Sequence, residues 1–143
     1  MVSHTQLILG LIDSGRIKPQ LKQAEKVVFH DPCYMARYNN SVGTPRKILD
    51  AVGGITRVEN LQRGKTAMCC GAGGGQMWME SSTKKINFIR LTDLRRSAST
   101  VAVGCPHCLT MFESAMSEDK VLSGMDIEEL SEIVAKGLDN VQS

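Results

Sequence analysis

Apolar and polar positions alternate along the chain in short blocks, and most blocks end at a glycine, a proline or a polar turn. The first block, residues 5–13, is apolar almost all round and stops at Gly15, which predicts a helix over about 4–14 with a glycine cap. Because apolar side chains point in all directions, we expect this helix to be covered on several sides. Residues 16–25 are polar and predict a connector, after which the core of the domain runs over residues 26–138.

Three β-branched and aromatic runs predict buried strands, at residues 26–30, 55–59 and 100–103. Turn residues follow the first and third of these runs, Asp31-Pro32 and Gly104 respectively. A shorter stretch, residues 65–68, is interpreted as an extended approach to the segment after it.

Helical patterns occur between and after the strands, at residues 44–52, 81–97, 105–116 and 126–138. The first of these helices has Thr44 as its cap and Pro45 in its first turn. In the third helix, Pro106 occupies the first position, where a proline is tolerated. The last helix has the clearest pattern, with Asp126 at the cap and Glu129 three residues later, the spacing of a capping box.

This order of elements predicts an α/β domain with three layers, a mainly parallel sheet and flanking helices. Ligands of such sheets collect outside the carboxyl ends of the strands. The cysteines of the chain follow the strands and the extended approach: Cys33, Cys69, Cys70, Cys105 and Cys108. We therefore expect the five thiols to meet at one edge of the sheet.

Composition limits what these thiols do. A chain of 143 residues folds without disulfides, and five cysteines cannot all pair with one another. The net charge of +2 and the 4% of aromatic residues argue against nucleic-acid binding. No secretory leader and no apolar run of about 18 residues is present, so we expect no membrane span and a reducing, cytoplasmic location.

Thiolates bind soft or borderline metals, and a CxxC at the start of a helix adds backbone N–H groups that stabilise negative charge. A single zinc ion uses four ligands, so five thiols suit an iron–sulfur cluster, or zinc with one spectator. Adjacent cysteines serve one site only from within a turn. The glycines after the pair permit such a turn, and we expect Gly71, Gly73 and Gly74 to give backbone clearance around a bulky cofactor.

Two other interpretations of the cysteines remain. Buried free cysteines can act as small hydrophobes. Cys105 and Cys108 can instead form a thioredoxin-like dithiol site, since they open a helix after a strand. The 35 residues after Cys108 contain no proline and are too few for the rest of that fold.

Side chains near the cysteines have a structural and a functional interpretation. Because the thiols already suffice as metal ligands, we expect His30 and His107 to lie outside the ligand set or to face solvent. Residues 77–79 (Met-Trp-Met) are expected in the core, or else as a lid or partner surface. Asp31 is expected to order the turn before Pro32. Basic side chains predict a solvated helix face, or a docking patch for an acidic redox partner: Lys84, Lys85, Arg90, Arg95 and Arg96.

The cysteine spacing resembles the cysteine-rich "CCG" module of heterodisulfide reductase and related iron–sulfur oxidoreductases. The family motif is one cysteine, then Cys-Cys-Gly, then CxxC, with some 35 residues between the parts. The sequence segments around the motif are also similar to those of the family: His30-Asp31-Pro32-Cys33-Tyr34, the run from Cys69 to Glu80, and Cys105-Pro106-His107-Cys108-Leu109. The resemblance covers about residues 4–138 and is closest to the C-terminal module of large, often membrane-anchored oxidoreductases that pass electrons between flavoproteins and quinones.

This resemblance implies a cofactor and partners. In the heterodisulfide reductase branch, the five cysteines hold a non-cubane four-iron four-sulfur cluster that reduces a disulfide, and in other branches one module holds zinc. The implied partners are a ferredoxin-like protein or flavoprotein and a second CCG module. Because relatives carry two modules and further domains, we expect this chain to be either a lone subunit or part of a longer protein, located in the cytoplasm or held by partners at the inner face of the membrane.

Overall fold

The computed structural model describes residues 1–80 and 85–139. The four strands of this part form one parallel sheet in the order β2-β1-β3-β4. The strands are β1 (Gln20–His30), β2 (Gly53–Val58), β3 (Thr100–Val103) and β4 (Asp126–Glu129). The helices are α1 (His4–Asp13), α2 (Gly43–Ala51), α3 (Ile86–Arg95), α4 (Pro106–Glu118) and α5 (Leu130–Asp139). Three short helical segments complete the order: η1 (Tyr34–Tyr38), η2 (Gly64–Thr66) and η3 (Gly73–Trp78).

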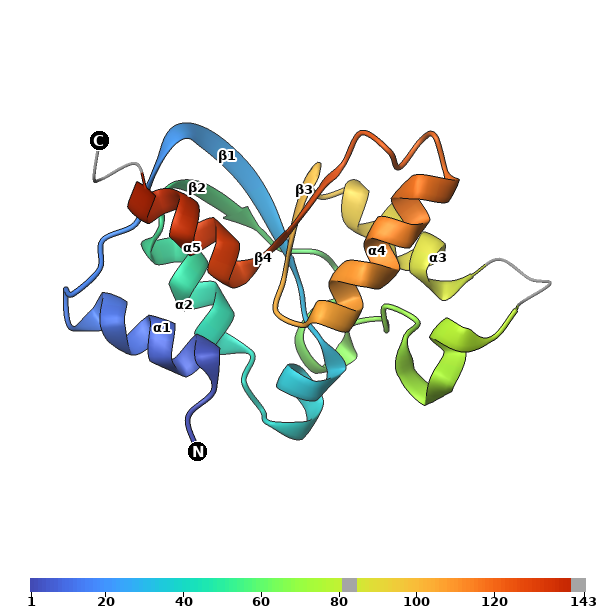
Figure 1. Ribbon diagram of the computed structural model, residues 1–143, viewed down its shortest axis with the longest axis horizontal. Coiled ribbons are helices and arrows are strands. Elements are labelled where there is room, and N and C mark those ends of the chain that lie inside the picture. Colours follow the sequence, from blue (N-terminus) through green and yellow to red (C-terminus); the bar gives the residue numbers. More distant parts are fainter. Residues whose placement is uncertain (81–84, 140–143) are drawn as a thin grey trace.

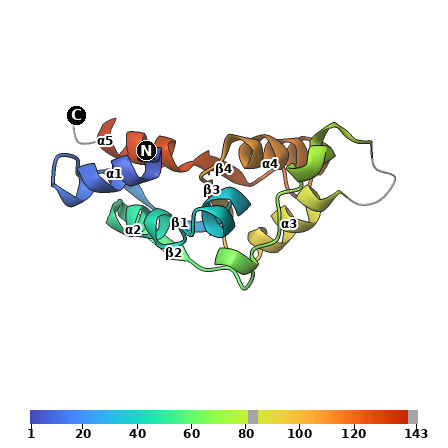
Figure 2. The same ribbon diagram turned by 90° about the horizontal axis from the view of Figure 1, so that it is seen from below.

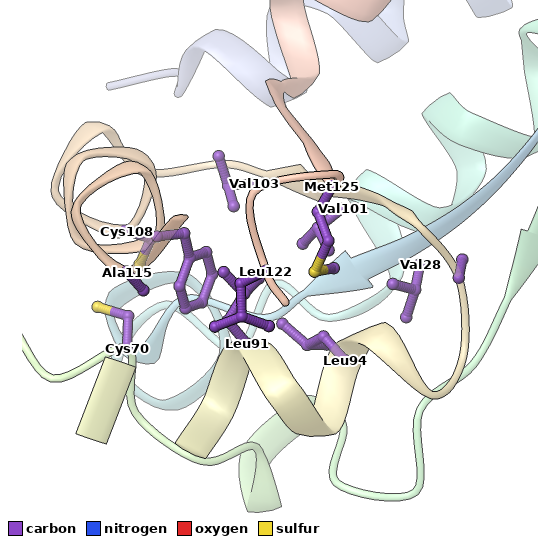
Figure 3. Close-up of a cluster of buried hydrophobic side chains, with 12 residues drawn as sticks. Val28, Cys70, Leu91, Leu94, Val101, Val103, Cys108, Ala115, Leu122 and Met125 are labelled. Carbon is purple, nitrogen blue, oxygen red and sulfur yellow. The ribbon is translucent and has the colours of Figure 1, made fainter. Parts of the chain in front are cut away.

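Helices cover both faces of the sheet, so the predicted three-layer α/β fold is confirmed (Figures 1 and 2). On one face, Val27 and Phe29 of β1 pack against residues of α2 and α5. On the other face, the alternate side chain Val28 joins residues of α3 and α4, as Figure 3 shows. Each of these fully buried apolar side chains contributes about 1.5–3 kcal/mol relative to exposure. The parallel sheet and both core layers therefore hold the carboxyl ends of β1 and β3 in fixed positions.

Strand β1 begins at Gln20, so the prediction of a connector over 16–25 and a strand from residue 26 is wrong for residues 20–25. The early part of β1 pairs with β2, with an irregularity between Gln20 and Glu25. Its polar side chains are mostly exposed and give no apolar alternation, because this part of the strand lies beyond the buried centre of the sheet.

The last helix begins at Leu130, and the predicted capping box at Asp126 is wrong. Residues 126–129 instead form β4, the edge strand that pairs with β3. The cap lies one turn later: Glu129 Oε2 accepts a hydrogen bond from the Ser131 N–H at 2.9 Å, and the Glu132 carboxylate accepts from the Glu129 N–H at 3.3 Å. Two capping-box patterns overlap in this segment, which explains the error. The first, Asp126 and Glu129, lies in β4, and the second, Glu129 and Glu132, lies at the start of α5.

The first helix agrees with its predicted ends but not with its predicted cover. Ser3 and Gln6 form a capping box at its start, and Gly15 adopts φ +70° after its end. Thr5 is its one buried residue, and Leu7 is 58% exposed. The helix packs through one side only, against α2, so the expectation of cover on several sides is wrong.

Smaller differences affect three other segments. Helix α2 begins at Gly43 with Val42 as its cap, so Thr44 is not the capping residue. Residues 65–68 form part of η2 and irregular chain, and the predicted extended approach is wrong. Residues 81–84, at the start of the predicted helix 81–97, lie outside the described residues, and α3 begins at Ile86. Strand 100–103 and the helix opened by Cys105 and Pro106 are confirmed.

No helix in the described part of the chain has the length and apolar character needed to cross a membrane.

Candidate metal centre

One cavity of about 900 Å³ is lined by all of the cysteines: Cys33, Cys69, Cys70, Cys105 and Cys108. Its lining residues come from the turns after β1 and β3, from η1 and η3, and from the starts of α1 and α4. The thiols differ in exposure: Cys33 is exposed, Cys69 and Cys105 are half-buried, and Cys70 and Cys108 are buried. The structure thus brings the five predicted residues to one hollow.

Cys33 is held by the turn after β1. The buried Asp31 carboxylate accepts hydrogen bonds from both terminal nitrogens of Arg46 in α2, at 2.7 and 2.8 Å. The same carboxylate accepts from the Gly64 N–H at 2.7 Å. The Asp31 carboxylate thus ties this turn to α2 and to the segment that leads to Cys69.

Cys69 and Cys70 reach the cavity from irregular chain, not from a strand end as predicted. Arg37 of η1 fixes this chain through its side chain. Its Nε donates to the Lys65 carbonyl at 2.9 Å, and its Nη2 donates to the Ala67 carbonyl at 2.7 Å. The segment after Cys33 therefore holds the segment before Cys69. Sequence reasoning did not single out Arg37, because nothing in the local pattern distinguishes it from a solvated arginine.

The glycines after the cysteine pair have different surroundings. Gly71 adopts φ +95°, and a Cβ there would lie 3.3 Å from the Asn87 nitrogen. The Gly71 N–H donates to the Cys69 sulfur at 3.3 Å. A Cβ at Gly73 or Gly74 would meet nothing within 4 Å. Of the three predicted glycines only Gly73 lines the cavity, and Gly75 joins it there.

A buried polar cluster adjoins the inner thiols. His30, Cys70 and Cys108 place their potential ligand atoms within 4.8 Å of one another. Figure 3 shows Cys70 and Cys108 side by side at one end of the core on the α3/α4 side. Arg90 lies behind His30 and is completely buried, so the prediction that Arg90 belongs to a solvated face is wrong. Lys85, Arg95 and Arg96 are exposed as predicted, and Lys84 lies outside the described residues.

Hydrogen bonds set the charge of the thiols. The hydrogen bond from Cys108, together with the N–H groups of Cys108 and His107, lowers the pKa of Cys105 to about 6. Hydrogen bonds from Cys108, His30 and the Ala72 N–H lower the pKa of Cys70. Hydrogen bonds to Cys105 and Cys70, with burial, raise the pKa of Cys108. Burial lowers the pKa of His30, which keeps the imidazole neutral at physiological pH.

This donor set fits a soft, cationic centre. The residues lining the cavity bring five thiol sulfurs and no lysine or arginine side chain. Two of these sulfurs sit at the start of α4, where backbone N–H groups stabilise negative charge. Only Cys70 and Cys108 are buried, so the interpretation of all five as inert buried cysteines is disfavoured.

The rim of the cavity carries exposed apolar side chains. Trp78 is 84% exposed and Tyr34 is 66% exposed. The expectation that residues 77–79 lie in the core is therefore wrong for Trp78 and Met79, and only Met77 is half-buried. His107 faces solvent, as predicted, whereas His30 is buried beside the sulfurs.

Nearly the whole chain is similar to parts of larger oxidoreductases. The chain is 40% identical over 137 residues to the probable iron-sulfur-binding oxidoreductase FadF of Bacillus subtilis, covering 92% of this chain and 19% of FadF. It is 28% identical to the EtfAB:quinone oxidoreductase of Syntrophomonas wolfei, covering 95% of this chain and 20% of that protein. It is 29% identical to a subunit of the dihydromethanophenazine:CoB–CoM heterodisulfide reductase of Methanosarcina barkeri, covering 96% of this chain and 34% of that protein.

The chain thus spans about a fifth to a third of the length of these relatives. No solved structure matches it significantly. The family model of the CCG cysteine-rich domain matches residues 27–113, more than half of the chain and the segment that contains every cysteine. The chain belongs to the CCG cysteine-rich domain family.

Proposed function

We propose that this domain binds an iron–sulfur cluster and relays electrons within a heterodisulfide-reductase-like oxidoreductase. The proposed ligands are the five cysteines, Cys33, Cys69, Cys70, Cys105 and Cys108, and the supporting observation is that all five line one cavity. The proposed cofactor is a four-iron four-sulfur cluster in the non-cubane form. Gly73 lines the cavity, and its backbone and that of the nearby Gly71 and Gly74 would leave room for this cluster.

The protein would tune the cluster through its own groups. When bound, an iron–sulfur cluster supplies one-electron redox chemistry and, in the stronger form of the proposal, reduces a disulfide. The start of α4 places N–H groups near Cys105, and the buried His30 lies beside Cys70. Such groups stabilise negative sulfur, which favours thiolate ligation of iron.

The partners are part of the same proposal. The relatives are named as an iron–sulfur-binding oxidoreductase, a quinone oxidoreductase and part of a heterodisulfide reductase, and this chain spans a minor share of each. We therefore propose that the single domain formed by residues 1–143 works with a ferredoxin-like protein or flavoprotein and with a second CCG module. Its proposed place is the cytoplasm, or the inner face of the membrane through those partners.

Cysteine-to-serine variants test the ligand set. Each of the five variants is expressed and purified without oxygen, and its iron and sulfide content is compared with that of the wild type. We expect every variant to lose cluster or to hold an altered one, since the sulfurs share one centre. The matched control is Tyr38→Phe, an exposed residue of η1 that does not line the cavity and should load fully. A variant series in which iron content is unchanged at four or five positions would overturn the proposal.

A zinc-binding structural role is the second candidate. In this role four of the cysteines bind the zinc. The close approach of the inner thiols favours it, because the Cys70 and Cys108 sulfurs lie within 4.8 Å of one another and Cys105 shares a hydrogen bond with Cys108. A tetrahedral zinc site needs four such ligands. In that case the protein would hold one equivalent of zinc and no sulfide, and loss of the exposed Cys33 would leave the zinc in place.

A further inference from the structure

Arg90 and His30 form a buried pair directly behind Cys70. The Arg90 Nε donates a hydrogen bond to the His30 Nδ1 at 3.2 Å. Its Nη1 donates to the Asp93 carboxylate at 2.9 Å and to the Asn60 Oδ1 at 3.3 Å, and its Nη2 donates to the Gln62 carbonyl at 3.0 Å. Arg90 has no exposed surface and His30 is 1% exposed. The guanidinium is thus fixed on three sides and cannot turn away from the imidazole.

The direction of this hydrogen bond determines where the imidazole carries its proton. A guanidinium donates hydrogen bonds and never accepts them. The Nδ1 atom must therefore present its lone pair to Arg90, and the proton of the neutral ring lies on Nε2. His30 is consequently a donor at Nε2 and has no free lone pair for a metal ion.

The sulfur of Cys70 lies within reach of that donor. A ring nitrogen of His30 and the sulfurs of Cys70 and Cys108 lie within 4.8 Å of one another. Because Arg90 occupies Nδ1, Nε2 is the ring nitrogen left to face these sulfurs. Phe112 packs edge-on against the imidazole with 4.9 Å between ring centroids, which limits rotation of the ring. Arginine, phenylalanine and sulfur together hold the imidazole in one orientation.

We propose that Arg90 is a positioning residue that locks His30 in the Nε2–H tautomer, so that His30 donates a hydrogen bond to the Cys70 sulfur and is not itself a metal ligand. For the cluster, this inference rests on the proposed function, because it assigns His30 a role toward a ligand of that cluster. A hydrogen bond to a ligand sulfur stabilises the more negative, reduced state. His30 should therefore raise the reduction potential of the centre.

Nuclear magnetic resonance of metal-free protein tests the tautomer without any cluster. In a long-range ¹H–¹⁵N spectrum, His30 should show a protonated Nε2 and an unprotonated Nδ1. A ring protonated at Nδ1 would overturn the inference. Because this arm needs no iron, a protein that fails to load a cluster sinks the proposed function and leaves this test intact.

A matched pair of variants tests the effect on the cluster. His30→Gln keeps an N–H near the position of Nε2, whereas His30→Phe fills the space with no donor. We expect His30→Phe to lower the ratio of reduced to oxidised centres about tenfold at a fixed potential, which equals about 59 mV for one electron. His30→Gln should stay close to the wild type. Equal potentials in wild type and His30→Phe would overturn the inference, and so would equal losses in both variants, which indicate a packing role alone.

Discussion

The Arg46 guanidinium donates to both oxygens of the Asp31 carboxylate, two residues before Cys33, and the Asp31 side chain is 1% exposed. Breaking a buried pair by removing one charge is costly because the other charge loses its partner. Asp31→Asn should lower the free energy of unfolding by about 3 kcal/mol, measured by urea denaturation.

The control for this variant is Asp50→Asn. Asp50 also forms a bidentate pair, with Nε and Nη2 of Arg57, but its side chain is 54% exposed. Exposed pairs contribute about 0–1 kcal/mol. Similar losses in the two variants would contradict the view that the turn before Cys33 depends on a buried ion pair.

Arg37 should keep the approach to Cys69 ordered through its bonds to the Lys65 and Ala67 carbonyls. In Arg37→Ala, these carbonyls lose charged donors that each contribute about 1 kcal/mol or more. We expect faster hydrogen exchange at residues 66–70 and lower cluster occupancy. Arg95→Ala is the control, because Arg95 is an exposed helix residue. Unchanged exchange in Arg37→Ala would show that the approach is held by other contacts.

Gly71 should not tolerate a side chain. Its φ of +95° is strained for any other residue, and a Cβ would press within 3.3 Å of the Asn87 nitrogen and the Ile86 Cβ. Gly71→Ala should lower the free energy of unfolding by about 1–3 kcal/mol. Gly73→Ala, where a Cβ meets nothing within 4 Å, should change it by less than about 0.5 kcal/mol. Thermal unfolding of both variants checks this difference.

Cys105 should react with iodoacetamide at unusually low pH in metal-free protein. Its pKa is lowered to about 6, so the thiolate fraction rises as pH increases through 6 and is nearly complete by about pH 7. An ordinary thiol, with a pKa of about 8.5, still reacts mainly above about pH 8. Mass spectrometry of the modified peptide gives the pH profile, with glutathione as the reference. A midpoint close to that of the ordinary thiol would contradict the hydrogen-bond arrangement around Cys108.

The other three cysteines separate the dithiol interpretation from the cluster. A dithiol oxidoreductase that uses only Cys105 and Cys108 should keep its activity when Cys33, Cys69 and Cys70 are replaced by serine. A cluster or zinc function should not, because at least two of those thiols are then needed as ligands.

Much of the fold and the meeting of the thiols was predictable from sequence. The run 100–103, Gly104 and Pro106 are local features that specify a strand end and a helix start, and the structure has both there. The parallel arrangement followed from the order of elements, and it brought Cys33 and Cys105 to one edge of the sheet.

The remaining features depend on tertiary contacts. β4 is a strand because it pairs with β3, which its four residues do not reveal alone. Arg90 has the sequence context of a surface charge. Its burial depends on hydrogen bonds from its guanidinium to His30, Asn60, Gln62 and Asp93. The exposure of Trp78 likewise follows from the path of η3 along the rim, which nothing in its apolar character indicates.

The most direct test of cluster binding is iron, sulfide and zinc analysis of anaerobically purified protein, combined with electron paramagnetic resonance. We expect about four iron atoms and four sulfides per chain and a paramagnetic signal in one redox state. A folded protein that contains no iron or sulfide and one equivalent of zinc would contradict the proposed cluster.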